Sequence, residues 1–119
     1  MSNTRQVGAD GEDRACIYLE HEGYNVITRN FRIREAEIDI IAVKENTLVF
    51  IEVKKRKNNC FGEPCESVTR AKQRKILAAA EVFLVSEGDT YCGHEIRFDV
   101  IGLIGTDVTH IMGAFDDTR

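Results

Sequence analysis

The sequence has little proline and no long apolar run. One proline and nine glycines among 119 residues, with 43% hydrophobic and 30% charged side chains, exclude a disordered or fibrous chain and indicate a single globular domain over residues 1–119. The longest apolar stretch, residues 76–85, is interrupted by Glu81 and is far shorter than the roughly 20 residues that cross a bilayer. We therefore expect no membrane span. A chain of this length buries enough surface to fold without disulfide or metal staples.

The N-terminal residues lack the apolar segment that marks export. Residues 1–5 contain one basic residue with no hydrophobic run behind it, so we expect no secretory signal and a cytoplasmic location. In that compartment reduced thiols are expected at all four cysteines, namely Cys16, Cys60, Cys65 and Cys92. A zinc site drawn from three of these cysteines and His94 has irregular spacing, which favours coincidence over metal binding.

Charge is unevenly distributed along the chain. Sixteen Lys and Arg against twenty Asp and Glu give a net charge of −4, which argues against a nucleic-acid partner because phosphate binding needs cations. Half of the positive charge, however, lies within residues 54–75, where only Glu63 and Glu66 are acidic. Such a segment is either a solvated face or a nucleic-acid contact surface. Its only aromatic residue is Phe61, which favours backbone contact with duplex or branched DNA over the stacking of single-stranded bases.

The apolar patterns predict a mixed α/β fold with the element order α-β-β-β-α-β and a central sheet flanked by helices. Helices are expected over residues 8–22 and 69–85, the second capped by Ser67 or Thr69. A polar loop is expected over residues 29–35. The expected strands cover residues 24–27 at a sheet edge, 36–43, 47–55 and 96–104, with a last short one over 108–112. The core would then span about residues 8–104, followed by a short tail over 105–119.

Two acidic residues interrupt the predicted hairpin. If Glu45 and Asn46 form a two-residue turn, alternation places Asp39 opposite Glu52 on one face, whereas a three-residue loop would break this register. The two carboxylates would then lie side by side, where like charges destabilise a sheet. Apolar residues surround them, and buried acids are costly unless they are paired or bind a metal. Mg²⁺ or Mn²⁺, which prefer oxygen ligands, is the expected compensating ion.

Other residues would complete this site. Glu12 shares the inward stripe of the first helix and is a candidate third ligand, although an acid in a first helical turn also serves the helix dipole. Lys54, on the same side as Glu52, would orient an attacking water, or would pair across the strands with Glu37. Oxygen ligands, a positioned water and a cation are what metal-assisted phosphodiester hydrolysis needs. A phosphate-facing patch would be formed by Lys55, Arg56, Lys57, Arg70, Lys72 and Arg74.

Asp39 followed by Glu52-Val53-Lys54 on a hairpin resembles the PD-(D/E)XK nuclease motif of restriction-endonuclease-like folds. Over roughly residues 8–115 the chain is similar, more narrowly, to the YraN family of small bacterial proteins. The matching segments are Gly11-Glu12, Arg29-Asn30, residues 37–42, residues 50–56, Gly62, Lys72, residues 97–101, His110 and Ala114-Phe115. One position departs from the family pattern, since Ala36 stands where a glycine usually precedes the Glu-Ile-Asp run.

The resemblance implies a Holliday-junction-resolvase-like domain of a bacterial cytoplasm, acting on branched DNA in repair or recombination. It places Glu12, Asp39, Glu52 and Lys54 at the positions of the nuclease site. It is also compatible with a homodimer, because resolvase-like domains often need two active sites for two strands.

Three functions are therefore distinguished. The leading hypothesis is a Mg²⁺- or Mn²⁺-dependent endonuclease acting on DNA. The alternative is a non-catalytic DNA- or RNA-binding module with the same fold, which would bind in a salt-dependent way without cleavage. A cytosolic scaffold with no nucleic-acid role would show no binding even at low ionic strength.

Overall fold

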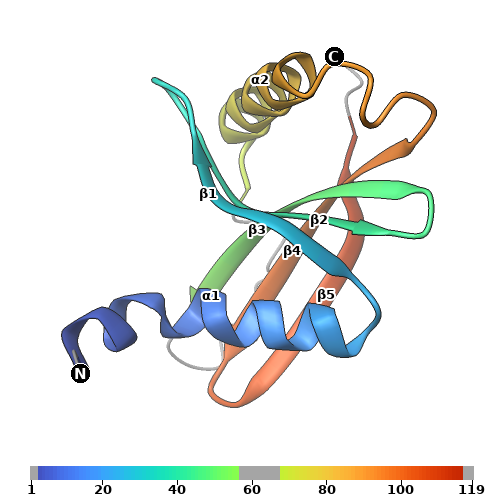
Figure 1. The fold of residues 1–119 in the computed structure, drawn as a ribbon. Helices are drawn as coiled ribbons and strands as arrows, with labels where there is room; N and C mark the ends of the chain where they lie inside the picture. The colour runs from blue at the N-terminus through green and yellow to red at the C-terminus, as the bar shows by residue number, and fades with distance from the viewer. Residues whose placement is uncertain (1–2, 57–67, 117–119) are drawn as a thin grey trace.

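The computed structural model describes residues 3–56 and 68–116. Within these ranges the chain forms two helices and five strands (Figure 1). The helices are α1 (Asn3–His21) and α2 (Arg70–Ser86), and the strands are β1 (Asn25–Arg32), β2 (Glu37–Lys44), β3 (Thr47–Arg56), β4 (Glu95–Ile104) and β5 (Asp107–Phe115). Neither helix has a stretch long and apolar enough to span a membrane, as judged over the described residues.

The five strands form one mixed sheet in the order β1-β2-β3-β4-β5. β3 and β4 are parallel neighbours joined through α2, and the other neighbouring strands are antiparallel. A parallel pair needs such a crossover connection, and here the helix supplies it. The predicted α/β class and the predicted α-β-β-β-α-β order are confirmed, and β5 is longer than the short strand expected over residues 108–112.

The hairpin of β2 and β3 has the predicted register from Ile40 to Lys44, but the predicted pairing of Asp39 with Glu52 is not part of the ladder, which ends at Ile40 and Ile51. A two-residue turn at Glu45 and Asn46 connects the strands, and Ile41 lies opposite Phe50. The turn is tied to the start of β4, because the backbone N–H of Glu95 donates to the Asn46 carbonyl at 2.9 Å. Thr69 is the N-cap of α2, as expected, and its side chain accepts from the backbone N–H of Lys72. The other cap candidate, Ser67, lies outside the described residues.

The polar loop predicted over residues 29–35 is wrong in its first half, because β1 continues through Arg32. The register of β1 against β2 shifts between Val26 and Thr28, which breaks the alternation that the sequence pattern relies on. Beyond the shift, Phe31 packs edge to face against Phe83 of α2, with ring centroids 5.4 Å apart. Burial of this aromatic ring outweighs the polar residues around it, so the strand extends.

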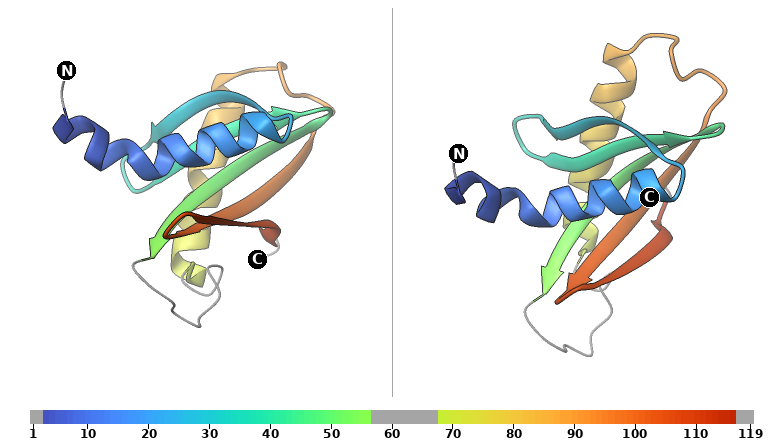
Figure 2. Two further views of the ribbon diagram at one scale, coloured as in Figure 1. Left: turned by 90° about the horizontal axis from the view of Figure 1, so that it is seen from below. Right: turned by 60° about the horizontal axis from the view of Figure 1, so that its bottom comes forward.

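The two helices cover opposite faces of the sheet (Figure 2). On one face α2 buries Ile76, Leu77, Ala79, Ala80 and Phe83 against the sheet. On the other face α1 buries a smaller set, namely Ala15, Cys16 and Leu19. Neighbouring apolar residues of β2 belong to different faces at one point: Ile40 packs on the α1 side, whereas Ile38 packs on the α2 side. The regular alternation of β2 therefore breaks next to Asp39.

We expect Phe83→Ala to lower the free energy of unfolding by about 3–5 kcal/mol, because the change leaves a cavity among the buried aromatic rings. Urea denaturation measures the loss. Val82→Ala is the matched control. Val82 directly precedes Phe83 and is 47% exposed, so this change should cost less than about 0.5 kcal/mol. Equal losses in the two variants would contradict the described packing of α2.

Candidate active site on the α2 face of the sheet

The antiparallel ladder between β2 and β3 ends at the pair Ile40 and Ile51, which are the chain neighbours of Asp39 and Glu52. Just beyond it, the backbone N–H of Val53 donates to Asp39 Oδ2 at 2.8 Å. A side-chain oxygen thus provides the acceptor for a strand N–H where the ladder has stopped. This hydrogen bond holds the Asp39 carboxylate against β3, beside Glu52.

Asp39 and Glu52 both line a cleft of about 380 Å³ between the sheet and the first turns of α2. The sheet contributes both carboxylates, and α2 contributes Lys72 and Lys75. The remaining lining residues are Glu35, Ala36, Glu37, Thr69, Ala71 and Ile76. The two acids that the sequence predicts to be adjacent therefore share one concave surface with basic residues.

Glu52 is the buried centre of the cleft. Its side chain is only 8% exposed, and its Oε2 atom lies 2.7 Å from Nζ of Lys72 and 3.5 Å from Nζ of Lys54. Two ammonium groups on one carboxylate oxygen satisfy the rule that a buried charge needs a partner. Lys72 comes from the helix and Lys54 from the same strand as Glu52, so the cleft is assembled from two layers of the fold.

Asp39 has no cation of its own within salt-bridge distance among the described residues. Burial, followed by the negative charge of Glu52, raises the pKa of the Asp39 carboxyl to about 7, although the Val53 N–H acts in the opposite direction. The negative charges of Glu12 and Glu37 also raise it, to a smaller extent. The cleft therefore carries more negative charge than its lysines neutralise at Asp39.

The two lysines respond differently to the site. Burial, together with the neighbouring Lys72, lowers the pKa of Lys54, whose side chain is 22% exposed. The hydrogen bond to Glu52 raises the pKa of Lys72 despite its partial burial. Lys72 is thus the firmly charged partner of Glu52, and Lys54 is a cation held in a less favourable environment.

Glu12, the predicted third ligand, lies on α1 and does not join the two carboxylates. Its Oε1 atom is 3.6 Å from Arg29 Nη2, and the same guanidinium pairs with Asp13 at 2.8 Å. Arg29 is placed beside α1 because β1 extends past the point where a loop was expected. Within the described residues, no three His, Cys, Asp or Glu side chains come together closely enough to hold a metal ion.

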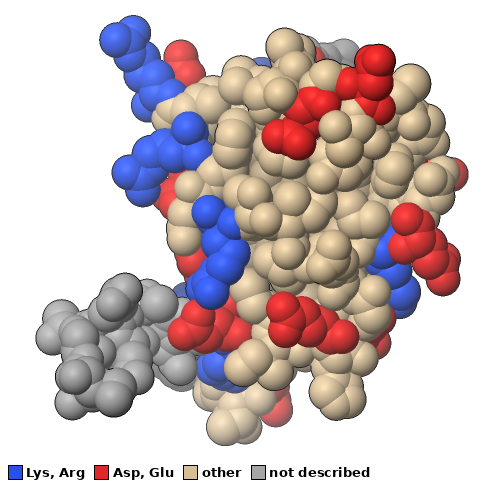
Figure 3. Space-filling model, viewed as in Figure 1, with Lys and Arg blue, Asp and Glu red and all other residues tan. Residues whose placement is uncertain are grey.

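The predicted basic patch is divided. Lys72 reaches the cleft, and Arg70 and Arg74 are exposed on α2. Lys55 packs its stem near Gly11 of α1, so it faces the other side of the sheet. Lys57 and the side chain of Arg56 lie outside the described residues. On the face shown in Figure 3, the coloured basic side chains are interspersed with acidic ones and form no continuous basic surface.

The donor set of the cleft fits a small dication. Asp39 and Glu52 offer carboxylate oxygens, which Mg²⁺ and Mn²⁺ prefer. Mg²⁺ usually keeps several waters and takes only one or two protein carboxylates together with substrate phosphates, so two acids are sufficient. Of the residues considered for a zinc site, Cys60 and Cys65 lie outside the described residues, and Cys92 is an exposed free thiol that is absent from the cleft lining.

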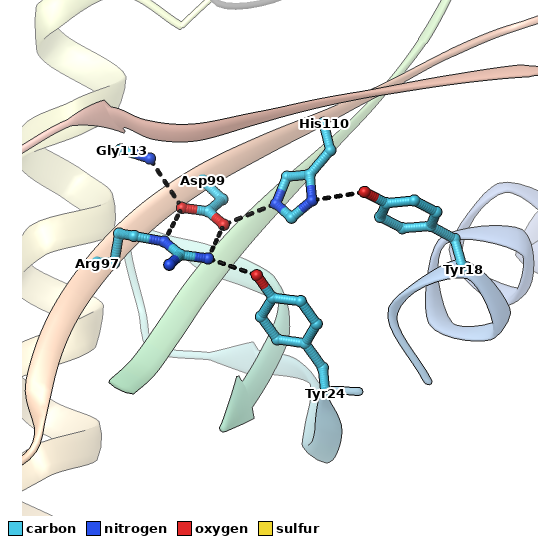
Figure 4. A network of polar contacts seen from close by, with 6 residues as sticks. All are labelled: Tyr18, Tyr24, Arg97, Asp99, His110 and Gly113. Carbon is cyan, nitrogen blue, oxygen red and sulfur yellow. Dashed lines mark hydrogen bonds and ion pairs between the residues drawn. The ribbon is translucent and has the colours of Figure 1, made fainter. Parts of the chain in front are cut away.

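A second polar cluster, on the α1 face, was not recognised from the sequence (Figure 4). Asp99 of β4 is fully buried and accepts two hydrogen bonds from Arg97 at 2.9 Å and one from the backbone N–H of Gly113 at 3.0 Å. His110 Nε2 lies 2.7 Å from Oδ2 of the same Asp99 carboxylate. The sequence signal was present, because Arg97 and Asp99 are two residues apart on a predicted strand and must share a face.

This cluster joins the sheet to α1 and to the start of β1. The Tyr18 hydroxyl lies 2.9 Å from His110 Nδ1, and Arg97 Nη2 donates to the Tyr24 hydroxyl at 2.6 Å. A neutral imidazole with its proton on Nε2 satisfies both neighbours, because Nε2 then donates to Asp99 and Nδ1 accepts from Tyr18. Sequence reasoning found no partner for His110, and the structure supplies two.

Comparison with known proteins gives one consistent result. The model of the uncharacterised protein family UPF0102 matches residues 11–103. The chain is 40% identical over 109 residues to a UPF0102 protein of Persephonella marina, with 92% of each chain covered. It is 42% identical over 118 residues to a UPF0102 protein of Desulfosudis oleivorans, covering 98% of this chain and 94% of the relative. A UPF0102 protein of Chlorobium chlorochromatii is 46% identical over 104 residues, or 86% and 77% of the two chains.

We expect Asp39→Asn to stabilise the protein at about pH 8 by about 2 to 4 kcal/mol. Because the folded-state pKa of Asp39 is raised from 3.8 to about 7, the folded protein binds this proton more tightly than the unfolded chain, and stability falls as pH rises between those values. Asparagine removes the charge but keeps an oxygen for the Val53 N–H. Urea denaturation across this pH range should show the gain growing with pH, whereas exposed Asp89→Asn should show none. A loss of stability at pH 8 would contradict the described charge balance.

In contrast to Asp39→Asn, Asp99→Asn should destabilise the protein. We expect it to lower the free energy of unfolding at neutral pH by about 3 kcal/mol, because Arg97 loses its charged partner. Burial raises the pKa of the Asp99 carboxyl, but the hydrogen bonds from His110, Arg97 and Gly113 together hold it below its ordinary value. The stability that this group supplies is therefore present above pH 3.8 and is lost as pH falls through the lowered folded-state pKa. Urea denaturation at neutral and acidic pH tests this, with exposed Asp107→Asn as the control. A deficit that stayed constant down to acidic pH would refute the assignment.

Proposed function

The chain belongs to the uncharacterised protein family UPF0102, also known as YraN, and we propose that it is a metal-dependent nuclease that hydrolyses phosphodiester bonds, with DNA as the expected substrate. The observation that carries the proposal is the pair of carboxylates, Asp39 and Glu52, that line one cleft together with Lys72, while Lys54 lies 3.5 Å from Glu52. An adjacent pair of acids in a concave, partly buried site is costly to the fold, which supports a functional role.

Each side chain of the cleft has a distinct role in this proposal. Asp39 and Glu52 would hold a Mg²⁺ or Mn²⁺ ion, which when bound polarises the scissile phosphate and lowers the pKa of a water molecule. Lys54, 3.5 Å from Glu52, would orient that water and oppose the negative charge that develops at phosphorus. Glu12 is not placed beside the two acids, so any role for it would follow from the substrate or from a movement of α1.

The position of α2 supports a nucleic-acid substrate. Its N-terminus opens into the cleft at Thr69, its first turn contains no acidic residue, and Lys72 and Lys75 extend along the cleft wall. Backbone N–H groups at a helix N-terminus and neighbouring ammonium groups both favour a phosphate. Exposed Arg70 and Arg74 on the same helix would extend the contact to flanking phosphates.

Branched, single-stranded and duplex DNA incubated with the protein in Mg²⁺ and in Mn²⁺ should separate the functions. We expect cleavage that chelation abolishes, and a loss of about 100-fold or more in Glu52→Gln, which keeps the shape of the side chain but removes its charge. Exposed Glu95→Gln at the start of β4 is the control and should cleave normally.

Two neighbouring lysines provide a second matched pair. Lys54→Ala should reduce cleavage strongly, whereas Lys55→Ala removes the same charge from the adjacent residue on the other face and should reduce it far less. Salt-dependent binding to DNA or RNA without cleavage by the unaltered protein would contradict the nuclease and favour the non-catalytic binding module.

A further inference from the structure

Lys72 already pairs with the carboxylate of Glu52, which the proposed dication would also need. Its Nζ atom lies 2.7 Å from Glu52 Oε2, closer than Lys54, which approaches the same oxygen at 3.5 Å. A dication held by Asp39 and Glu52 would have to bind a carboxylate that already pairs with two ammonium groups. The ammonium group of Lys72 and a dication would therefore compete for the Glu52 carboxylate.

Of the groups involved, Lys72 is the one that can leave. The Glu52 side chain is 8% exposed, and Asp39 is held to β3 by the Val53 N–H. The Lys72 side chain is 42% exposed and reaches Glu52 on a long, flexible stem from α2. The carboxylates can thus stay in place while the ammonium moves away.

A displaced Lys72 would remain at the mouth of the cleft. It lies in the first turn of α2, near the Thr69 cap and one helical turn before Lys75, and all three residues line the same cleft. The first turn of α2 contains no acidic residue that could pair with the released ammonium. Apart from Asp39 and Glu52, the acids that line the cleft are Glu37, which already pairs with Arg32 at 3.2 Å, and exposed Glu35. The released ammonium of Lys72 would meet the backbone phosphate of a bound nucleic acid.

We propose that Lys72 is an exchangeable counter-ion of the cleft, which neutralises Glu52 in the metal-free protein and transfers to the substrate phosphate when a dication binds. This inference rests on the proposed function. It makes Lys72 a residue that couples metal binding to nucleic-acid binding. It also explains why a pair of acids, one of them buried, is tolerated before any metal is present, since the buried Glu52 is paired and Asp39 is the one that lacks a cation.

Calorimetric titration with Mn²⁺ tests the first half of the proposal. We expect Lys72→Gln to bind Mn²⁺ about tenfold more tightly than the unaltered protein, because the metal no longer has to break the charged hydrogen bond to Glu52. Arg74→Gln removes the same charge from the exposed surface of the same helix and should change the affinity less than about twofold. Lys72→Arg, which keeps the charge, should stay close to the unaltered protein.

The outcomes separate this inference from the proposed function. Binding of Mn²⁺ by the unaltered protein with equal affinities in Lys72→Gln and Arg74→Gln would overturn the counter-ion role and leave the metal site intact. Absence of Mn²⁺ binding in every variant would overturn the metal site itself and the inference with it. Binding by Lys72→Gln alone would support the inference in its strongest form.

The second half concerns the phosphate. Fluorescence anisotropy with a short duplex DNA, with and without Ca²⁺, gives the increase in DNA affinity caused by an ion that takes the same oxygen ligands. The increase should be smaller in Lys72→Gln than in Arg74→Gln, because only the former lacks the ammonium that the ion releases. Equal increases would overturn the transfer of Lys72 to phosphate.

Discussion

The hydrogen bond from the Val53 N–H to the Asp39 carboxylate is the contact on which the cleft depends. It forms where the antiparallel ladder of β2 and β3 has ended, so it replaces a contact between backbones with one that requires a side-chain oxygen. The same contact keeps Asp39 within range of the negative charge of Glu52, which helps to raise its pKa to about 7. The side chain of Asp39 thus accepts the strand N–H at the end of the ladder and also forms an unfavourable pair of negative charges with Glu52.

The negative charge of the cleft is only partly neutralised by its lysines. Lys72 and Lys54 both approach Glu52, whereas no cation reaches salt-bridge distance of Asp39 among the described residues. Stability alone would favour an uncharged group at Asp39. Retention of unfavourable charge in a concave site is typical of residues that a bound ion or substrate later neutralises. The negative charge of Asp39 in the cleft is therefore unfavourable, while the backbone around it is held by ordinary sheet and helix contacts.

The carboxylate pair could be predicted because it depends on short-range rules. A two-residue turn and regular alternation place Ile41 opposite Phe50 within one hairpin. Asp39 and Glu52 come directly after the end of that ladder, so the same rules bring them near each other although they are not a ladder pair. Other parts depend on contacts between distant segments. The pairing of Glu12 with Arg29 follows from the continuation of β1 past a register shift between Val26 and Thr28, and no local pattern marks that shift. The contact of Lys72 with Glu52 depends on how the crossover helix lies across the sheet, which its apolar stripe indicates only in part.

The Asp99 cluster has a consequence for the order in which the chain acquires structure. Its hydrogen bonds connect Tyr18 and Tyr24 with Arg97 and His110, so they span contacts separated by up to 92 positions. During synthesis on the ribosome, the buried acid of β4 has no imidazole partner until His110 has been translated. The earlier strands can collapse before then, but the contacts of His110 with Asp99 and Tyr18 can form only after β5 has been synthesised, so this part of the α1 face is completed late.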